Sequence, residues 1–421
     1  MAANGAKPWA IPAGIYAHIP FCVSKCAYCD FLSFGKDTAA DAQERYAAAL
    51  CRELKTARES FLRGVAIDTV YIGGGTPTAL PAPFLLEITG EIHQFNLTEG
   101  AEFTVECNPG TVDGAYLRRL KDSGANRLSV GLQAAQNSFL KILRRAHTAE
   151  DFFNVYEAAR SAGFGNINVD IMFALPGAGF DGGASAGAYQ TKADWLETLN
   201  AVVKRSPEHI SAYSLTLEEG TPLYGRVERG ELTLPGDEAD REMYALCKEV
   251  LSAAGYAHYE ISNYARRGYE SRHNTRYWKR TPYFGFGLGA HSFDGKARWR
   301  NTHDLSKYIG NNLSHEESRT GKGVNEEVAK EEFTPEKFKR EDYETLSEKD
   351  AMAETLFLGL RLMEGVSRRG FERVFNVPLE DVYGAEIRKL VSQGLLCESG
   401  GNIRLTELGM DLANQVFVRF L

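Results

Sequence analysis

The sequence predicts an α/β protein with a parallel sheet and a smaller C-terminal α+β domain. Three observations lead to this. Short apolar runs alternate with amphipathic stretches up to about residue 260, glycine-rich or polar motifs follow several of the runs, and the pattern changes beyond residue 343. The expected strands are Ile15–Ile19, Asp68–Ile72, Glu102–Cys107, Arg127–Gly131, Asn166–Phe173 and His209–Leu215. Six such units suit either an open doubly wound sheet or a partial barrel.

Amphipathic stretches separate these runs, and their lengths suit helices of three to six turns. The expected helices are Thr38–Ser60, Pro83–Phe95, Val112–Ser123, Ala149–Ala162 and Thr191–Arg205. Two stretches, Gly177–Gln190 and Ser314–Asp342, have few large apolar residues and are expected to be surface loops or linkers.

The ending GLLCESGGNIRLTELG predicts the last helix and hairpin of a winged-helix-like domain. DNA binding is the obvious alternative for such a domain. Acidic residues outnumber basic ones from Glu344 onward, which favours a packing or lid role instead. The expected divisions are therefore 1–265, a connecting segment at 266–342, and 343–421.

Composition limits the class of protein. The 421 residues are 43% hydrophobic and carry a net charge of −8, so a nucleic-acid partner is not expected. The beginning of the chain has no signal-like pattern, and no run approaches the roughly 18 apolar residues that span a bilayer. We expect a soluble, cytoplasmic protein without an integral membrane segment.

Three of the seven cysteines, Cys22, Cys26 and Cys29, form a CxxxCxxC motif. Three thiolates on one loop can bind three irons of a [4Fe–4S] cluster and leave the fourth iron open to a small molecule. The alternatives are a zinc site and three unrelated buried cysteines. A structural zinc ion needs a fourth ligand, and the nearby His18 precedes the loop in an apolar stretch.

Residues suited to ligand binding follow the later strands. The glycines of the run from Gly73 to Thr78 let a ligand approach the backbone. Glu106 ends the third strand, where a carboxylate can accept hydrogen bonds from ammonium or hydroxyl groups. Asp170 lies in an otherwise apolar strand, where an unpaired carboxylate is costly. Arg145 offers a fork of donors to a carboxylate. Each residue alone also fits an ordinary turn, salt bridge or buried hydrogen bond.

Together these motifs resemble the radical S-adenosylmethionine (SAM) superfamily. The run from Tyr16 to Phe21 before Cys22 resembles its anaerobic coproporphyrinogen III oxidase (HemN/HemW) family. The resemblance implies a six-stranded partial (β/α) barrel in which a [4Fe–4S] cluster held by the three cysteines reductively cleaves SAM to a 5′-deoxyadenosyl radical. It also implies one or two bound SAM molecules. The implied SAM contacts are Tyr16, Gly74 and Glu106 for the first molecule, and Tyr28, Gly75, Thr76, Gln133, Arg145 and Asp170 for the second.

Two features favour the HemW branch, whose members act as heme chaperones. Oxidases of the family usually have a fourth cysteine two residues past the third, where this chain has Phe31. The run from His273 to Trp278 fits the HemW pattern HNxxYW. His273 is a suitable iron ligand, and Tyr277 and Trp278 offer flat surface for a porphyrin. Arg272 and Arg276 could pair with propionates. Taken alone, an aromatic-rich helix with one histidine is more often part of a packed core.

The leading hypothesis is a heme chaperone that binds heme and passes it to acceptor hemoproteins. The alternative is an oxygen-independent coproporphyrinogen III oxidase, and the motifs do not decide whether SAM is cleaved or only bound. Both hypotheses imply an electron donor such as flavodoxin or ferredoxin. The oligomeric state is open, although exposed iron–sulfur systems of this kind can form homodimers.

Overall fold

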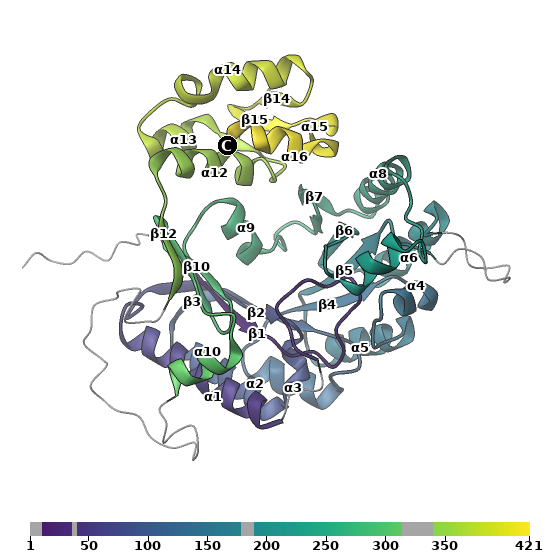
Figure 1. Cartoon of the computed structure of the whole chain (residues 1–421), viewed down its shortest axis with the longest axis vertical. Helices are drawn as coiled ribbons and strands as arrows, with labels where there is room; N and C mark the ends of the chain where they lie inside the picture. Colours follow the sequence, from purple (N-terminus) through teal and green to yellow (C-terminus); the bar gives the residue numbers. More distant parts are fainter. Residues whose placement is uncertain (1–10, 36–39, 178–188, 314–339) are drawn as a thin grey trace, which may run out of the picture.

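The computed structural model describes residues 11–35, 40–177, 189–313 and 340–421. Within them, one mixed sheet of twelve strands forms the main body (Figure 1). From one edge to the other, the strands are β12 (Glu341–Thr345), β11 (Ala297–Arg300), β10 (His291–Phe293), β9 (Tyr283–Phe286), β1 (Ala13–Ile19), β2 (Ala66–Gly74), β3 (Asn96–Cys107), β4 (Arg127–Gln133), β5 (Ile167–Phe173), β6 (His209–Ser214), β8 (Asn263–Ala265) and β7 (Ala257–Glu260).

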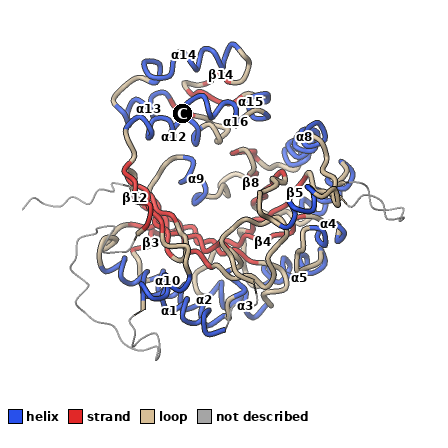
Figure 2. Tube along the Cα trace, viewed as in Figure 1, coloured by secondary structure: helices blue, strands red, loops and turns tan. Residues whose placement is uncertain are grey.

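Strands β1 to β6 lie side by side in chain order and are all parallel, which confirms the predicted α/β architecture. Strand β9 adds a further parallel strand beside β1, and the outer strands on both sides are antiparallel. The two edges do not pair with each other, and the sheet is curved (Figure 2). Strands β1 to β6 therefore form the predicted six-stranded partial barrel, which β9 extends by one further parallel strand.

Most helices of the main body cover the outer, convex face of this sheet (Figures 1 and 2). The helices of the main body, including α9 on the other side of the sheet, are α1 (Ala40–Glu59), η1 (Pro77–Ala79), α2 (Ala82–His93), α3 (Gly114–Asp122), α4 (Asn137–Ile142), α5 (Ala149–Ser161), α6 (Lys192–Val203), α7 (Pro222–Glu228), α8 (Asp237–Ala253), α9 (Arg272–Trp278) and α10 (Leu305–Asn312). Capping boxes at Thr148 and Thr191 fix the starts of α5 and α6, because each threonine side chain accepts a backbone N–H three residues on.

The central strands of the sheet are almost completely buried. All seven residues of β4 are buried, and six of the seven in β5. The exception in β5 is Asp170, whose half-buried position puts a carboxyl group on the concave face. An apolar core thus holds the carboxyl ends of β1 to β5 in fixed positions, and the polar motifs follow those ends.

The C-terminal residues form a second, smaller unit with its own core, which includes Leu356, Phe371 and Phe420. Its three-stranded sheet includes the predicted hairpin and confirms the winged-helix-like α+β domain. Its elements are α12 (Glu348–Gly359), β13 (Val366–Ser367), α13 (Arg368–Phe375), α14 (Leu379–Ser392), β14 (Leu396–Ser399), β15 (Asn402–Leu405), α15 (Glu407–Asp411), α16 (Ala413–Phe417) and η3 (Val418–Phe420).

Helix α9 lies between the concave face of the sheet and this unit (Figure 1). The buried carboxylate of Glu354 pairs with Arg280 and Arg298, at 2.9 Å from each. Most of the two expected loops falls at 178–188 and 314–339, outside the described residues. No helix among the described residues has the length and apolar character needed to span a membrane.

Candidate functional site

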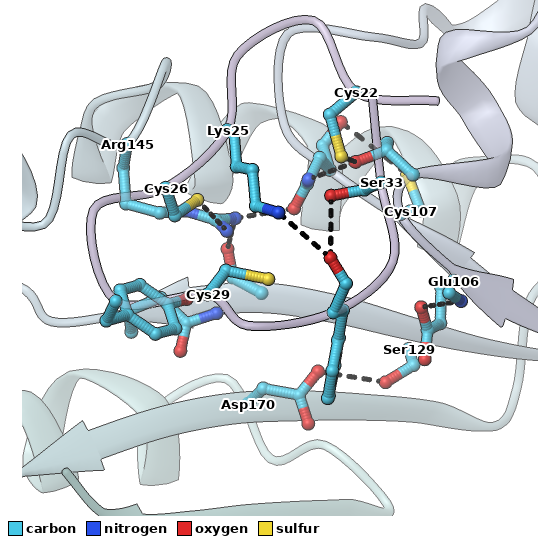
Figure 3. A pocket seen from close by; sticks show the side chains of 18 of the residues that line it. Cys22, Lys25, Cys26, Cys29, Ser33, Glu106, Cys107, Ser129, Arg145 and Asp170 are labelled. Carbon is cyan, nitrogen blue, oxygen red and sulfur yellow. Dashed lines mark hydrogen bonds between the residues drawn. The ribbon is translucent and has the colours of Figure 1, made fainter. Parts of the chain in front are cut away.

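The three cysteines of the CxxxCxxC motif lie on the loop that follows β1 (Figure 3). Two backbone hydrogen bonds close the base of this loop, from Cys22 N to Phe34 O (2.8 Å) and from Phe34 N to Pro20 O (2.7 Å). A third bond, from Ala27 N to Leu143 O (2.9 Å), ties its far end to the turn after α4. The loop therefore has a defined shape, and its three thiols line one cavity of about 380 Å³.

A chain of polar contacts joins two of these thiols through side chains from other strands. Thr76 Oγ1 donates to Cys22 Sγ (3.7 Å), and Asn108 Nδ2 donates to Thr76 Oγ1 (2.7 Å). Arg145 then donates to Asn108 Oδ1 (2.5 Å) and to Cys26 Sγ (3.4 Å). Donors of this kind stabilise negative charge on sulfur, so the surroundings suit thiolate ligands.

The donor set fits an iron–sulfur cluster. Burial raises the pKa of Cys22 and raises that of Cys29 to about 11, so these thiols keep their protons until a metal replaces them. Among the described residues, no three His, Cys, Asp or Glu side chains are grouped as one metal ion would require. The three thiols are instead spread around one end of the cavity (Figure 3).

The cavity brings together most of the residues expected to contact SAM. Besides the cysteines, the predicted residues that line it are Tyr28, Gly74, Gly75, Thr76, Glu106, Gln133, Arg145 and Asp170. Tyr28 lies on the cysteine loop itself, and the others come from β2 to β5, the segments that follow these strands, and the turn after α4, as expected for a site on a parallel barrel. Tyr16 is placed differently: it lines an adjoining cavity, described below.

Two half-buried carboxyl groups, those of Glu106 and Asp170, face the cysteine loop across the first cavity (Figure 3). Glu106 accepts hydrogen bonds from Tyr71 Oη (2.8 Å) and Gly74 N (3.2 Å), and burial raises its pKa to about 7. Asp170 accepts from Ser129 Oγ (2.9 Å) and Asn168 Nδ2 (2.8 Å), and burial raises its pKa as well. Such groups suit a ligand that brings positive charge or hydroxyl donors.

The glycine run after β2 is required by close packing. Gly74 has a φ of +112°, and a Cβ there would lie 2.5 Å from the His18 ring. A Cβ on Gly75 would lie 2.8 Å from the carbonyl oxygen of Phe21. Gly75 N also donates to Ile19 O (2.8 Å). The glycines thus let the end of β2 contact the start of the cysteine loop.

A second cavity, of about 440 Å³, adjoins the first and shares Phe31, Gly74 and Glu106 with it. Aromatic and imidazole side chains provide most of its polar lining. They are Tyr16, His18, Tyr277, Tyr283, His291 and His303. Tyr277 of the HNxxYW run and Tyr16 of β1 therefore line the same cavity.

His273 of the same run is buried, with 1% of its surface exposed. Its Nδ1 lies 3.0 Å from Thr69 Oγ1 and its Nε2 lies 2.9 Å from Tyr277 Oη. Burial lowers its pKa to about 3, so the ring is neutral. In this arrangement both ring nitrogens are occupied, and the histidine positions the tyrosine that lines the second cavity.

The other residues considered for heme are placed away from that cavity. Arg272 and Arg276 both pair with Asp68. Trp278 lines neither cavity, and its ring packs under the guanidinium of Arg361, whose central carbon is 4.4 Å from the ring centroid. The propionate-binding role considered for the two arginines is therefore not supported by their contacts.

Sequence reasoning did not single out several residues of these cavities. Asn108 lies two residues after Glu106 in the sequence. The residues around it do not indicate that its side-chain amide makes hydrogen bonds to both Thr76 and Arg145. Tyr71, Lys25 and Tyr213 also line the first cavity. The alternation of β2, which puts Tyr71 two residues before Gly73, was the available signal for Tyr71.

Comparisons with known proteins agree with this geometry. Residues 16–181 match the Radical SAM superfamily, and residues 346–412 match the HemN C-terminal domain. The heme chaperone HemW of Lactococcus lactis is 35% identical over 414 residues, which cover 97% of both chains. The chain belongs to the HemW family. Membership in the radical SAM superfamily implies a [4Fe–4S] cluster and SAM, for which the first cavity has suitable donors.

Other HemW relatives and a solved structure extend the comparison. The heme chaperone HemW of Bacillus subtilis is 34% identical over 413 residues, covering 96% of this chain and 98% of that protein. The HemN coproporphyrinogen III oxidase of Escherichia coli has the same fold, with a TM-score of 0.76 over 97% of this chain and 90% of that one, at 21% identity. These findings confirm the family and the fold predicted from the motifs.

Proposed function

We propose that this protein is a heme chaperone that binds heme and transfers it to acceptor hemoproteins. Its similarity over nearly the full length to relatives named as heme chaperones supports this function. The structural observation that carries it is the second cavity, where Tyr277 of the HNxxYW run meets Tyr16 and several imidazoles. Aromatic faces and imidazole nitrogens are the groups that hold a porphyrin and its iron.

In this proposal the first cavity holds the cluster and SAM. When bound, a cluster with three protein thiolates supplies one open iron position and a single electron. Cys22, Cys26 and Cys29 hold it, while Thr76 and Arg145 donate hydrogen bonds to two of the sulfurs. The carboxylates of Glu106 and Asp170 would orient the cationic and hydroxyl groups of SAM.

Phe31 supports the chaperone over the oxidase. It stands where the oxidases of the family usually have a further cysteine, and 61% of its surface is exposed. Its side chain lines both cavities and so borders the proposed SAM and heme sites. We further propose a flavodoxin- or ferredoxin-type electron donor and a cytoplasmic location.

An anaerobic assay separates the two functions. The cluster is reconstituted, SAM, dithionite and coproporphyrinogen III are added, and porphyrins are analysed by chromatography beside a heme titration. Saturable heme binding without decarboxylated product is the result expected of a chaperone. Conversion to protoporphyrinogen IX with formation of 5′-deoxyadenosine would establish the oxidase and overturn this proposal.

A further inference from the structure

We propose that heme lies in the second cavity and that the imidazole of His303 is an axial ligand of its iron. In this proposal His291 contributes to heme binding beside His303, and His273 is not a ligand. This inference rests on the proposed heme-binding function and assigns it to particular atoms. Three features support it: the hydrogen bonds of each histidine around the cavity, the position of His303, and the three tyrosines that line the same cavity.

Two of the histidines near this cavity, His18 and His273, already use both ring nitrogens in hydrogen bonds within the protein. His18 Nε2 donates to Leu32 O (2.9 Å), so its Nδ1 is the acceptor for Tyr16 Oη (2.9 Å). His273 has a partner at each ring nitrogen and is almost completely buried. Coordinating iron with either ring would break a buried hydrogen bond and leave its partner unsatisfied.

His291 and His303 differ from these two. Both side chains are exposed, and neither makes a hydrogen bond or an ion pair with a described residue. Each can therefore offer a ring nitrogen without losing an internal contact.

His303 is the better placed of the pair. Its ring lies against the backbone of Gly289, where a Cβ would be 2.6 Å from His303 Cδ2. Gly289 has a φ of +64°, in the turn between β9 and β10, and lines the cavity itself. An iron in the cavity would thus meet this imidazole.

Three tyrosines complete the site. The rings of Tyr277 and Tyr283 meet edge to face, with 4.7 Å between centroids, and Tyr16 lines the same cavity. Such rings give a porphyrin apolar contact, and their hydroxyl groups can meet its polar edge. His273 contributes indirectly, because its Nε2 holds Tyr277 Oη. His273 is a positioning residue in this arrangement.

The test uses the cluster-loaded full-length protein, titrated with ferric heme and, separately, with metal-free protoporphyrin IX. Spectra are taken as differences from the heme-free protein. For His303→Ala we expect heme affinity to fall about tenfold or more, an altered Soret band, and nearly unchanged protoporphyrin binding. Added imidazole should restore the original spectrum. His291→Ala should weaken heme binding less, and His303→Ala/His291→Ala should remove the histidine-ligated spectrum.

His93→Ala is the matched control, because His93 is an exposed histidine on α2, on the helical face of the sheet. It should leave both titrations unchanged. His273→Ala should weaken heme binding but preserve the ligand spectrum. An unchanged spectrum in the His303/His291 double variant, or loss of the ligand spectrum in His273→Ala, would overturn this inference while heme binding itself stands. A wild-type protein that binds no heme would overturn both the inference and the proposed function.

Discussion

Arg145 and Cys26 are joined by a hydrogen bond from Nη1 to Sγ of 3.4 Å, although 119 positions separate them in the chain. The other terminal nitrogen of the same guanidinium reaches Asn108, which in turn donates to Thr76 beside Cys22. One cation thus acts on two of the proposed cluster ligands, directly on one and through two side chains on the other.

Removing this cation should make the bound cluster harder to reduce. Arg145→Gln is expected to shift its midpoint potential by roughly 60 mV to more negative values, the one-electron equivalent of about 1.4 kcal/mol. Potentiometric titration followed by EPR measures this. Arg144→Gln is the control, since Arg144 is exposed and lines neither cavity. Equal potentials in wild type and Arg145→Gln would refute a role of Arg145 at the cluster.

The raised pKa of Glu106, about 7, predicts a pH dependence of SAM binding. The carboxyl group is an anion above this value and neutral below it, so its attraction for a cationic ligand is lost as the pH falls. Affinity for SAM should therefore drop by up to about tenfold per pH unit below 7. Equilibrium dialysis between pH 6 and pH 8 measures this dependence, and Glu106→Gln should flatten it. A pH dependence equally steep in that variant would assign the effect to another group.

The packing of Gly74 against His18 predicts a loss of stability for Gly74→Ala. Both the positive φ and the 2.5 Å approach of the added Cβ oppose the change, at a cost on the order of 2–3 kcal/mol. Gly90→Ala is the same substitution at an exposed position of α2 with open space around it, and it should stabilise by about 0.5–1 kcal/mol. Urea unfolding of the metal-free protein compares them. If Gly74→Ala and Gly90→Ala changed the free energy of unfolding by the same amount and in the same direction, close packing of Gly74 against His18 would be contradicted.

The buried, neutral His273 predicts a contribution to acid sensitivity. Its pKa is about 3 in the folded protein, against an ordinary value of 6.5, so between these values the unfolded chain binds a proton that the folded chain does not. Stability therefore falls as the pH is lowered through this window, by about 2–3 kcal/mol at pH 4.5. Denaturant titrations should show a smaller acid loss in His273→Gln. An identical loss would mean that His273 is protonated in the folded state.

The local pattern of the sequence was enough to predict the parallel core. The runs that begin at Asp68 and Arg127 lie in β2 and β4, because period and polarity within a strand are local properties. The addition of β9 to β12 beside β1 was not predicted, since pairing between Tyr283 and residues near Gly14 depends on contacts far apart in the chain.

Contacts between residues far apart in the chain also limited what could be predicted of the site. CxxxCxxC and the residues after β2 to β5 were found because each follows a strand end, where parallel barrels gather ligand contacts. The second cavity escaped notice because Tyr16, Tyr277 and His303 come from three distant segments. Core packing of the helix that carries His273 was a recognised alternative, but its hydrogen-bond partner Thr69 on β2 lies 204 positions away and could not be predicted. Its suitability as a metal ligand was visible from residue type, but its occupied nitrogens were not.

The proposed function requires that the cysteine loop holds an iron–sulfur cluster. The most direct measurement is the iron and sulfide content and visible absorbance of anaerobically reconstituted Cys22→Ala, Cys26→Ala and Cys29→Ala, with Cys397→Ala from the C-terminal unit as control. We predict that each loop variant loses the brown chromophore and its iron, while Cys397→Ala keeps both. A loop variant with full cluster absorbance would contradict the assignment of these cysteines.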